Sequence, residues 1–304
     1  MSELRTTFEF EITIDLSHVL QLEPVPANAM IKTNYDQHTV RTSFAHSAIL
    51  ASVLILLLPG FIASALVTDQ SGAESHRELV DINTYPWSSI GKVGIPGFRA
   101  VNTCTGAVIG PNQFLTAGHC LYNARTERFV TAGSIHFLLG LVRDEFHAHR
   151  VGSRYIVPPT FVPAKVDAFG EDWAVVETDE AFPADIRPLL LATVIPSPGT
   201  AVKTGGYDFP RVRVMTADKH CRIIAISVDK KRISNDCAIY PGDSGGPPLG
   251  ANEGEEDLIW GVNSLRLREN AEIEKLPKES GVAVAAASIS DFLATHAAGS
   301  VERR

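Results

Sequence analysis

Three short segments place a serine, a histidine and an aspartate in surroundings that suit nucleophilic catalysis. They are Leu115–Cys120 (LTAGHC), Asp172–Val176 (DWAVV) and Pro241–Pro247 (PGDSGGP). A serine hydroxyl attacks a carbonyl group at neutral pH when a base within hydrogen-bonding reach takes its proton, and histidine has a suitable pKa. A carboxylate on the second ring nitrogen fixes the tautomer and stabilises the cation that forms. The candidates are Ser244 as nucleophile, His119 as base and Asp172 as the residue that orients the base.

Each candidate has alternatives within the chain. His119 is one of ten histidines, and it stands out because it follows an apolar run and precedes Cys120. Asp172 directly opens the apolar segment Trp173–Val176, which the neighbouring acids do not; these are Asp144, Asp167 and Asp179. The pair His147-x-His149 has the spacing of two metal ligands. Without further ligands we expect these histidines to be surface residues, and we predict no metal site.

The glycines around Ser244 let the backbone turn tightly, so the amides of Gly242 and Ser244 could point together at a developing oxyanion. Losing one such donor typically costs about 2.7–4 kcal/mol of transition-state stabilisation. The same run also fits the G-x-S-x-G nucleophile elbow of alpha/beta-hydrolases, a fold that requires its aspartate and histidine after the serine. Only His296 follows Ser244, and alternating strands and helices are missing. We therefore set the elbow interpretation aside.

The elements that must position these residues are expected to be strands. From Val80 onward, short β-branched and apolar runs alternate with glycine, proline and asparagine, and Gly110–Asn112 predicts a hairpin turn. This texture indicates an all-β sandwich or barrel. One helix is expected, over Asp291–His296 with Ser290 as its N-cap. The expected strands are Ser88–Val93, Thr105–Ile109, Gln113–Ala117, Ile135–Leu141, Arg150–Val157, Trp173–Val176, Ala201–Gly205, Cys221–Val228 and Leu258–Val262.

The motifs Thr-Ala-Gly-His-Cys and Gly-Asp-Ser-Gly-Gly-Pro, in the chain order His, Asp, Ser, resemble those of the chymotrypsin-like serine peptidases. The resemblance runs from about Val80 to about Thr295. Within the family, Tyr85–Gly91 (YPWSSIG) is similar to the opening segment of bacterial secreted members related to glutamyl endopeptidases. The resemblance implies two packed six-stranded antiparallel β-barrels, a catalytic cleft between them and a serine endopeptidase that works through an acyl-enzyme. A catalytically silent homologue that acts as a binding protein is the alternative.

The expected domain organisation follows from composition and from this resemblance. The segment Ala48–Ala65 is uncharged and apolar and ends in Ala-Ser-Ala, which is typical of a secretory signal. A retained anchor is the alternative, since roughly 18 apolar residues can just span a bilayer of about 30 Å. The expected parts are an upstream extension (1–29), a signal peptide (30–65), a linker or propeptide (66–79), an N-terminal barrel (80–190) and a C-terminal barrel with the terminal helix (191–304).

The resemblance also implies an activation switch and a primary specificity pocket. In the switch, a newly formed terminal amine pairs with the acid before the nucleophile; Asp243 supplies that acid and Val80 is the candidate terminus. Ala238 occupies the position where an acid selects lysine and arginine, and Asn263 the stretch where glutamyl endopeptidases place a histidine. Neither preference is therefore supported. We expect Ala238, Asn263 and Ser264 to line the substrate pocket.

Four cysteines, Cys104, Cys120, Cys221 and Cys237, all follow the expected signal, and an even number in an exported chain suggests two disulfides. Three pairings are possible, and we favour the local one, Cys104–Cys120 and Cys221–Cys237. Each bridge would close a loop of about 16 residues, worth about 3 kcal/mol in the chain-entropy model. A zinc site is the alternative, but no C-x-x-C pair supports it.

The bulk composition narrows the partners. The chain has 304 residues, of which 45% are apolar and 20% charged, enough for one large or two small cores. Its net charge of −8 argues against nucleic acid, because phosphate binding needs a basic face. We predict no cofactor, a monomer with protein or peptide substrates, and a secreted or periplasmic location. Membrane association is expected only if Ala48–Ala65 is retained as an anchor.

Overall fold

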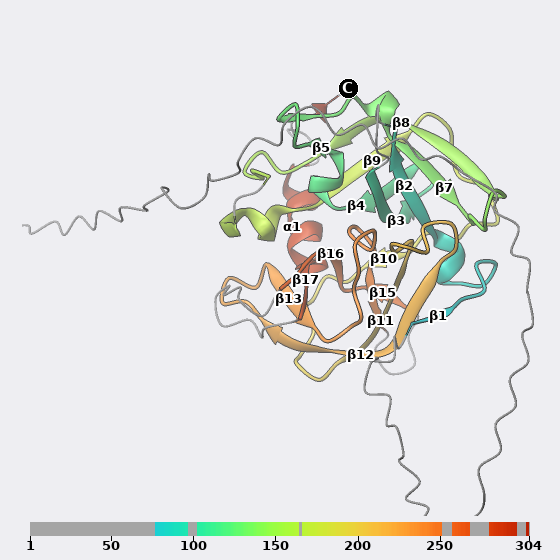
Figure 1. Ribbon diagram of the computed structural model, residues 1–304. Coiled ribbons are helices and arrows are strands. Elements are labelled where there is room, and N and C mark those ends of the chain that lie inside the picture. Colours follow the sequence, from blue (N-terminus) through green and yellow to red (C-terminus); the bar gives the residue numbers. More distant parts are fainter. Residues whose placement is uncertain are drawn as a thin grey trace, which may run out of the picture. The chain divides into compact units, whose positions relative to one another are not determined.

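Six antiparallel strands close into a first barrel in the order β2-β3-β4-β9-β8-β7, with β8 paired to β9 and β2 paired to β7 (Figure 1). The computed structural model describes residues 77–96, 102–163, 166–250, 257–267, 280–296 and 302–303. The barrel strands are β2 (Ile90–Ile95), β3 (Asn102–Gly110), β4 (Gln113–Thr116), β7 (His136–Leu139), β8 (Ala148–Ile156) and β9 (Ala174–Thr178). A short strand, β18 (Glu302–Arg303), pairs with β8, and a hairpin is formed by β5 (Tyr122–Asn123) and β6 (Arg128–Phe129).

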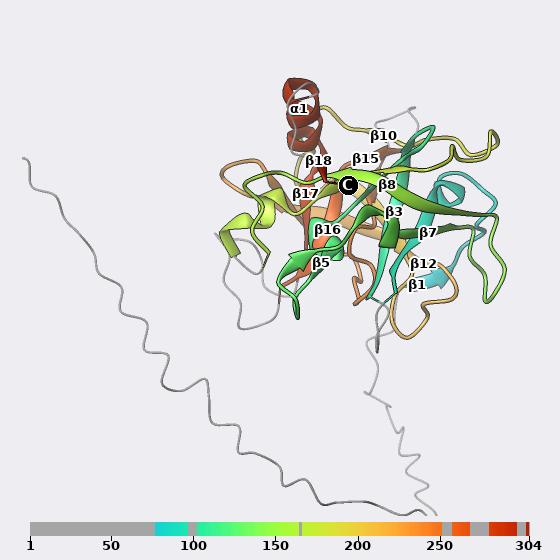
Figure 2. The same cartoon turned by 90° about the horizontal axis from the view of Figure 1, so that it is seen from above.

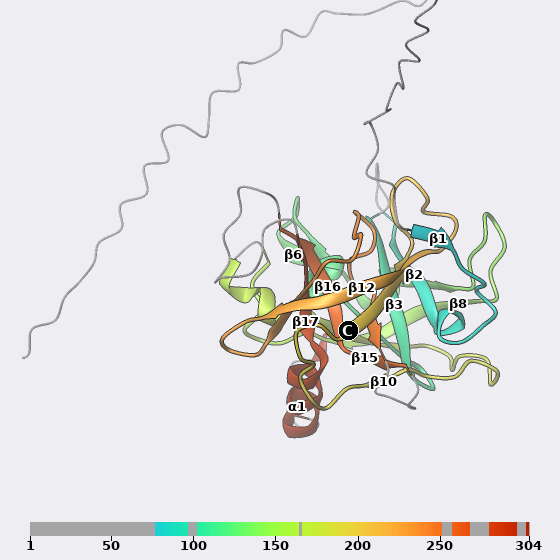
Figure 3. The ribbon, with the colours of Figure 1, turned by 90° about the horizontal axis from the view of Figure 1, so that it is seen from below.

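A second sheet follows the order β14-β11-β12-β13-β17-β16 and curves back on itself (Figure 3). Its strands are β11 (Ala201–Gly206), β12 (Thr216–Ile226), β13 (Arg232–Asn235), β14 (Pro248–Gly250), β16 (Gly261–Arg266) and β17 (Gly281–Ala285). Its two ends meet where the Asn263 N–H donates to the Gly246 carbonyl oxygen at 2.9 Å. Three short strands extend this sheet: β1 (Arg77–Leu79) pairs with β12, β15 (Leu258–Ile259) pairs with β14, and β10 (Leu190–Leu191) pairs in parallel with β15. The predicted all-β fold is thereby confirmed.

Residues 77–79 belong to the second sheet, although their composition had grouped them with the expected linker. They form β1, which pairs antiparallel with β12 so that Arg77 lies opposite Asp218. Arg77 is buried, whereas the next two residues, Glu78 and Leu79, are exposed. The strand therefore contributes one inward side chain to the second sheet, which is called the second barrel below because its two ends meet.

Aromatic and branched side chains fill the first barrel. Phe114 and Phe137 stack with their ring centroids 4.3 Å apart, and neither has exposed surface. The β9 residues Ala174, Val175 and Val176 are all buried, so both the barrel interior and the neighbouring parts of the fold cover this strand. This packing makes the β4–β9 pair a rigid support for the loops at its end.

Both predicted disulfides are present, Cys104–Cys120 and Cys221–Cys237. The first joins β3 to the short 3-10 helix Gly118–Leu121, and the second joins β12 to the segment before the nucleophile. The sulfurs are bonded to one another, so they offer no thiolate to zinc.

The C-terminal helix begins earlier than predicted. Helix α1 (Ala286–His296) projects beside the strands (Figure 2), and Ser290 lies inside it rather than at its N-cap. The helix continues directly from β17, because its first residues Ala286 and Ala287 are buried and have high helix propensity. Phe292 packs edge-on against Trp173 at 5.2 Å between ring centroids. None of the described helices is long and apolar enough to cross a membrane.

Shortening a buried leucine tests the first core. Leu139 has no exposed surface, so Leu139→Ala should lower the free energy of unfolding by about 2–5 kcal/mol through lost burial and a cavity. Leu190 is 61% exposed, so Leu190→Ala is the matched control and should change it by no more than about 0.5 kcal/mol. Urea unfolding measures both variants. Equal losses would show that the barrel is packed differently.

Candidate active site

Strand pairing brings His119 and Asp172 to the same end of the first barrel. Strands β4 and β9 run antiparallel, with Thr116 opposite Ala174. His119 follows Thr116 by three residues and Asp172 precedes Ala174 by two. Because the strands are antiparallel, the segment that leaves β4 and the segment that enters β9 meet at one edge.

The Asp172 carboxylate is buried, 1% exposed, and holds the histidine at two points. Its Oδ2 lies 2.7 Å from His119 Nδ1, and its Oδ1 accepts the His119 backbone N–H at 2.7 Å. Ser264 Oγ donates to the same Oδ2. An ionised carboxylate can only accept hydrogen bonds, so Nδ1 carries the proton and Nε2 is left as the basic nitrogen.

Two opposing influences set the pKa of His119. Burial lowers it, but the charge of Asp172 and its hydrogen bond together raise it further, so the net shift is upward from 6.5. A raised pKa makes the imidazole a stronger proton acceptor near neutral pH.

The neighbouring acids have other partners. Asp144 pairs with Arg213, and Asp179 accepts the backbone N–H of Val151. Asp167 lies in the 3-10 helix Val166–Glu171, and its side chain is outside the described part of the chain. Of the aspartates with described side chains, Asp172 is the one that contacts the ring of His119.

Tight contacts between the barrels shape the loop that carries Ser244. The Thr105 N–H donates to the Ser244 carbonyl oxygen at 2.8 Å, and Thr105 Oγ1 donates to the Gly242 carbonyl oxygen at 2.8 Å. Gly242 and Gly245 have φ of +103° and +84°, which favour glycine. A Cβ on Gly245 would lie 2.2 Å from the Thr105 carbonyl oxygen. The glycines therefore allow the nucleophile loop to lie directly on β3.

Two backbone donors of this loop have no acceptor within the described part of the chain. Among the described residues, no group accepts the N–H of Gly242 or of Ser244, whereas Gly245 donates to the Asn263 carbonyl oxygen and Asp243 to that of Tyr240. Two free amides next to a serine can stabilise negative charge on a substrate oxygen.

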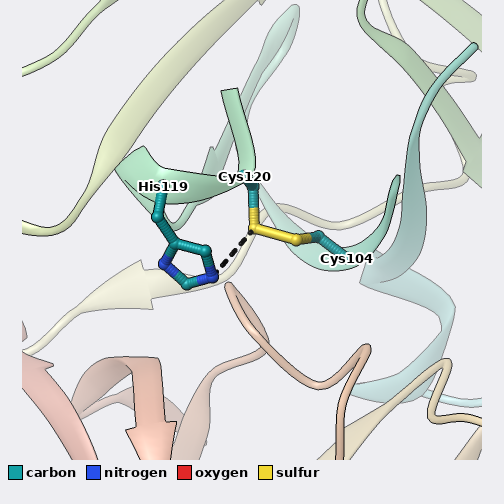
Figure 4. A group of neighbouring side chains, drawn as sticks. All are labelled: Cys104, His119 and Cys120. Carbon is teal, nitrogen blue, oxygen red and sulfur yellow. Dashed lines mark hydrogen bonds between the residues drawn. A yellow bond between two sulfur atoms is a disulfide. The ribbon is translucent and has the colours of Figure 1, made fainter. Parts of the chain in front are cut away.

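The disulfide Cys104–Cys120 lies beside both the base and the nucleophile. Figure 4 shows His119 Nε2 directed toward Cys120 Sγ, 3.9 Å away. The same sulfur lies 3.8 Å from the carbonyl oxygen of Ser244. Across the described residues, no hydrogen bond joins Ser244 to the His119 ring; catalytic contacts of this kind often tighten only when substrate binds. The cysteines and His119 cluster closely enough for a metal ion, but disulfide sulfurs are not thiolate ligands.

Asp243 has no exposed surface, and its carboxylate is held at both oxygens. Arg77 Nη2 donates to Oδ1 at 3.0 Å and the Tyr240 N–H donates to Oδ2 at 2.9 Å. Burial raises the pKa of Asp243 to about 7, against the lowering influence of Arg77 and the Tyr240 N–H. Sequence reasoning missed Arg77, because a three-residue strand next to a polar segment has no distinctive pattern.

The three expected pocket residues have different surroundings. Ala238 is half-buried, and its carbonyl oxygen accepts a hydrogen bond from Arg77. The Asn263 side chain is buried and donates to Thr204 Oγ1 at 2.9 Å; its Oδ1 has no partner among the described residues. The Ser264 hydroxyl donates to Asp172 Oδ2.

The chain was compared with known proteins in sequence and in structure. It is 25% identical over 178 residues to a glutamyl endopeptidase of Bacillus licheniformis, which covers 58% of this chain and 53% of that protein. The chain therefore spans about half the length of this curated relative. A solved structure described as a Glu endopeptidase in complex with MPD superimposes with a TM-score of 0.60 and 21% identity, covering 73% of this chain and 97% of the other. This likeness shows a shared fold.

A family model adds evidence that is independent of any single relative. The trypsin model matches residues 80–293, a stretch that contains both barrels, His119, Asp172 and Ser244. With so much of the chain matched, this protein belongs to the trypsin family.

Proposed function

We propose that this chain is an exported serine endopeptidase that hydrolyses peptide bonds through an acyl-enzyme on Ser244. The observation that carries the proposal is the buried Asp172 carboxylate, 2.7 Å from Nδ1 of His119, beside a loop with two amides that no described residue accepts from. Similarity to glutamyl endopeptidases supports a protein or peptide substrate.

In the proposed reaction, the same catalytic groups act first in forming the acyl-enzyme and again in hydrolysing it. His119 Nε2 takes the proton of the Ser244 hydroxyl as Oγ bonds to the carbonyl carbon of the substrate. The N–H groups of Gly242 and Ser244 stabilise the resulting oxyanion. The C–N bond then breaks, and the imidazolium gives its proton to the leaving amine. A water molecule repeats the cycle on the acyl-enzyme, releasing the acid and restoring the Ser244 hydroxyl.

Asp172 supports this cycle without exchanging a proton. Its negative charge stabilises the imidazolium that forms twice in each turnover, and its two contacts prevent the ring from rotating. Ser264 satisfies a second lone pair on Oδ2. The orienting carboxylate is therefore itself oriented by a residue of the second barrel.

Export is the proposed setting. Two disulfides join the described cysteines, and such bonds persist in oxidising compartments. We propose that residues 30–65 direct export and that the exported fold comprises the first barrel (80–190) and the second barrel (191–304) together with β1 (Arg77–Leu79). The segment Ala48–Ala65 lies outside the described residues.

Removing the nucleophile tests the proposed activity. Wild-type protein should cleave casein and react with a serine-directed phosphonate, whereas Ser244→Ala should do neither, because the attacking oxygen is gone. Ser197→Ala is the matched control at an exposed position and should behave as wild type. Mass spectrometry reads the phosphonate adduct. A folded wild type that neither labels nor cleaves would support the alternative of a silent binding protein.

The pH dependence tests the role of His119. Only the neutral imidazole can accept a proton, so kcat/KM should fall as pH drops through the raised pKa of His119, with a midpoint above 6.5. Asp172→Asn should lower kcat by about 10⁴-fold, because it permits the wrong tautomer. It should also move the acid limb to lower pH. A control, Asp185→Asn, alters an exposed acid and should leave the profile unchanged. An acid limb that is unchanged in Asp172→Asn would contradict the assignment.

A further inference from the structure

The side chain of Arg77 is fully buried in the second barrel and uses each of its three nitrogens. Nη2 donates to Asp243 Oδ1 at 3.0 Å and to the Thr216 carbonyl oxygen at 2.6 Å. Nη1 donates to the Ala238 carbonyl oxygen at 2.8 Å, and Nε to Thr216 Oγ1 at 3.0 Å. The guanidinium thus donates hydrogen bonds to both ends of the segment from Ala238 to Asp243, which directly precedes Ser244.

The backbone explains how Arg77 reaches this place. Strand β1 pairs with β12 through Arg77–Asp218 and Leu79–Thr216, so the strand is held along its length. Alternation along β1 turns Arg77 inward and Glu78 outward, where Glu78 pairs with Lys219. The contact with Asp243 is therefore built by sheet pairing and does not depend on a free chain end.

Several charged groups surround the Arg77 head. Asp243 accepts directly from it, and the Tyr240 ring lies 6.0 Å from its central carbon. Asp208 is buried, pairs with Arg211 and accepts from Thr216 Oγ1. Asp218, opposite Arg77, accepts the backbone N–H groups of Ala238 and His220. Asp208 is already paired with Arg211, and Asp218 already accepts two backbone amides. Arg77 is therefore the cationic partner of Asp243.

A buried carboxylate beside the nucleophile has to be paired, since an unpaired buried charge is strongly disfavoured. One Asp243 oxygen is occupied by Arg77 and the other by the Tyr240 N–H. Both oxygens are thus bound in a chain that is continuous through Leu79 and Val80. The pairing expected from an amine released at Val80 is already made by a side chain three residues earlier.

We propose that Arg77 is a positioning residue that pairs with Asp243 and holds the nucleophile loop in its working shape without cleavage before Val80. The proposal rests on the proposed peptidase function and adds its mode of activation. Any propeptide then ends upstream of Arg77, and β1 is part of the active enzyme. A guanidinium keeps its charge throughout the pH range in which a terminal amine, with an ordinary pKa of about 7.7–8.0, loses its proton. The pairing with Asp243 therefore survives alkaline conditions that would neutralise an amine.

The chain start of the active species gives the first test. The full-length chain is expressed, and the protein that is exported is labelled with a serine-directed phosphonate. The labelled molecules are then analysed by intact mass and peptide mapping. We expect the labelled species to contain Arg77. If labelled molecules begin only at Val80, the proposal is overturned while the peptidase function stands. If wild type does not label at all, the peptidase function itself fails.

A substitution that removes the charge of Arg77 gives the second test. Arg77→Gln removes the charge and should lower kcat by about 10²-fold, comparable to losing one oxyanion donor, with little change in KM. Glu78→Gln, on the exposed face of the same strand, is the matched control and should retain wild-type kcat. An Arg77→Gln variant with wild-type kcat and wild-type labelling would overturn the proposal.

Arg77→Lys keeps the test decisive if Arg77→Gln does not fold. Lysine preserves the charge near neutral pH but loses it with a pKa of about 10.4. This variant should be active at neutral pH and lose kcat as pH rises toward 10, whereas wild type should not. Both enzymes should share the acid limb of His119. Identical alkaline profiles for wild type and Arg77→Lys would show that Arg77 does not set the shape of the loop.

Discussion

The buried carboxylate of Asp172 lies where the two barrels meet and accepts hydrogen bonds from both. His119 contributes a backbone N–H and its ring Nδ1 from the first barrel, and Ser264 contributes its hydroxyl from β16 of the second. Burying an ionised carboxylate is tolerable only when its lone pairs are satisfied. This requirement is met only when the barrels are packed in their observed register. The geometry of the base therefore depends on the association of the barrels as much as on either one alone.

The nucleophile loop also depends on contacts with both barrels. It belongs to the second barrel, yet Thr105 of β3 holds it by its backbone N–H and its hydroxyl. The second barrel closes at this loop too, through the paired backbones of Asn263 and Gly246. One stretch of chain thus serves as catalytic loop, barrel seam and inter-barrel contact. A change that loosens any of these is expected to disturb the other two.

Local patterns were sufficient to predict much of this arrangement. The three candidate catalytic residues lie in short motifs, and the nine predicted strands all overlap observed ones because apolar and turn-forming residues alternate along them. Gly110–Asn112 does connect β3 to β4, as a turn between antiparallel strands. The predicted local cysteine pairing was confirmed, and each bridge joins cysteines 16 positions apart.

The missed features depend on contacts that are distant in sequence. Strand β13 (RISN) is buried at every position and shows no alternation, so its neighbours in the barrel define it rather than its own pattern. Arg77 contacts Thr216, 139 residues away, and nothing within three residues of β1 signals that partner. The hydroxyl of Ser264 donates to Asp172, a partner 92 residues away in the sequence that the local pattern of its strand does not indicate. Spacing reveals which residues can react, but sheet register decides which residues support them.

The two short strands β1 and β18 have a consequence for how this fold can be divided. Strand β1 precedes the first barrel in the chain but pairs with β12 of the second, and β18 follows the second barrel but pairs with β8 of the first. Each barrel is therefore extended by a short strand that lies beyond the other barrel in the chain. Exchanging one barrel between relatives as a single block of sequence would leave this added strand behind.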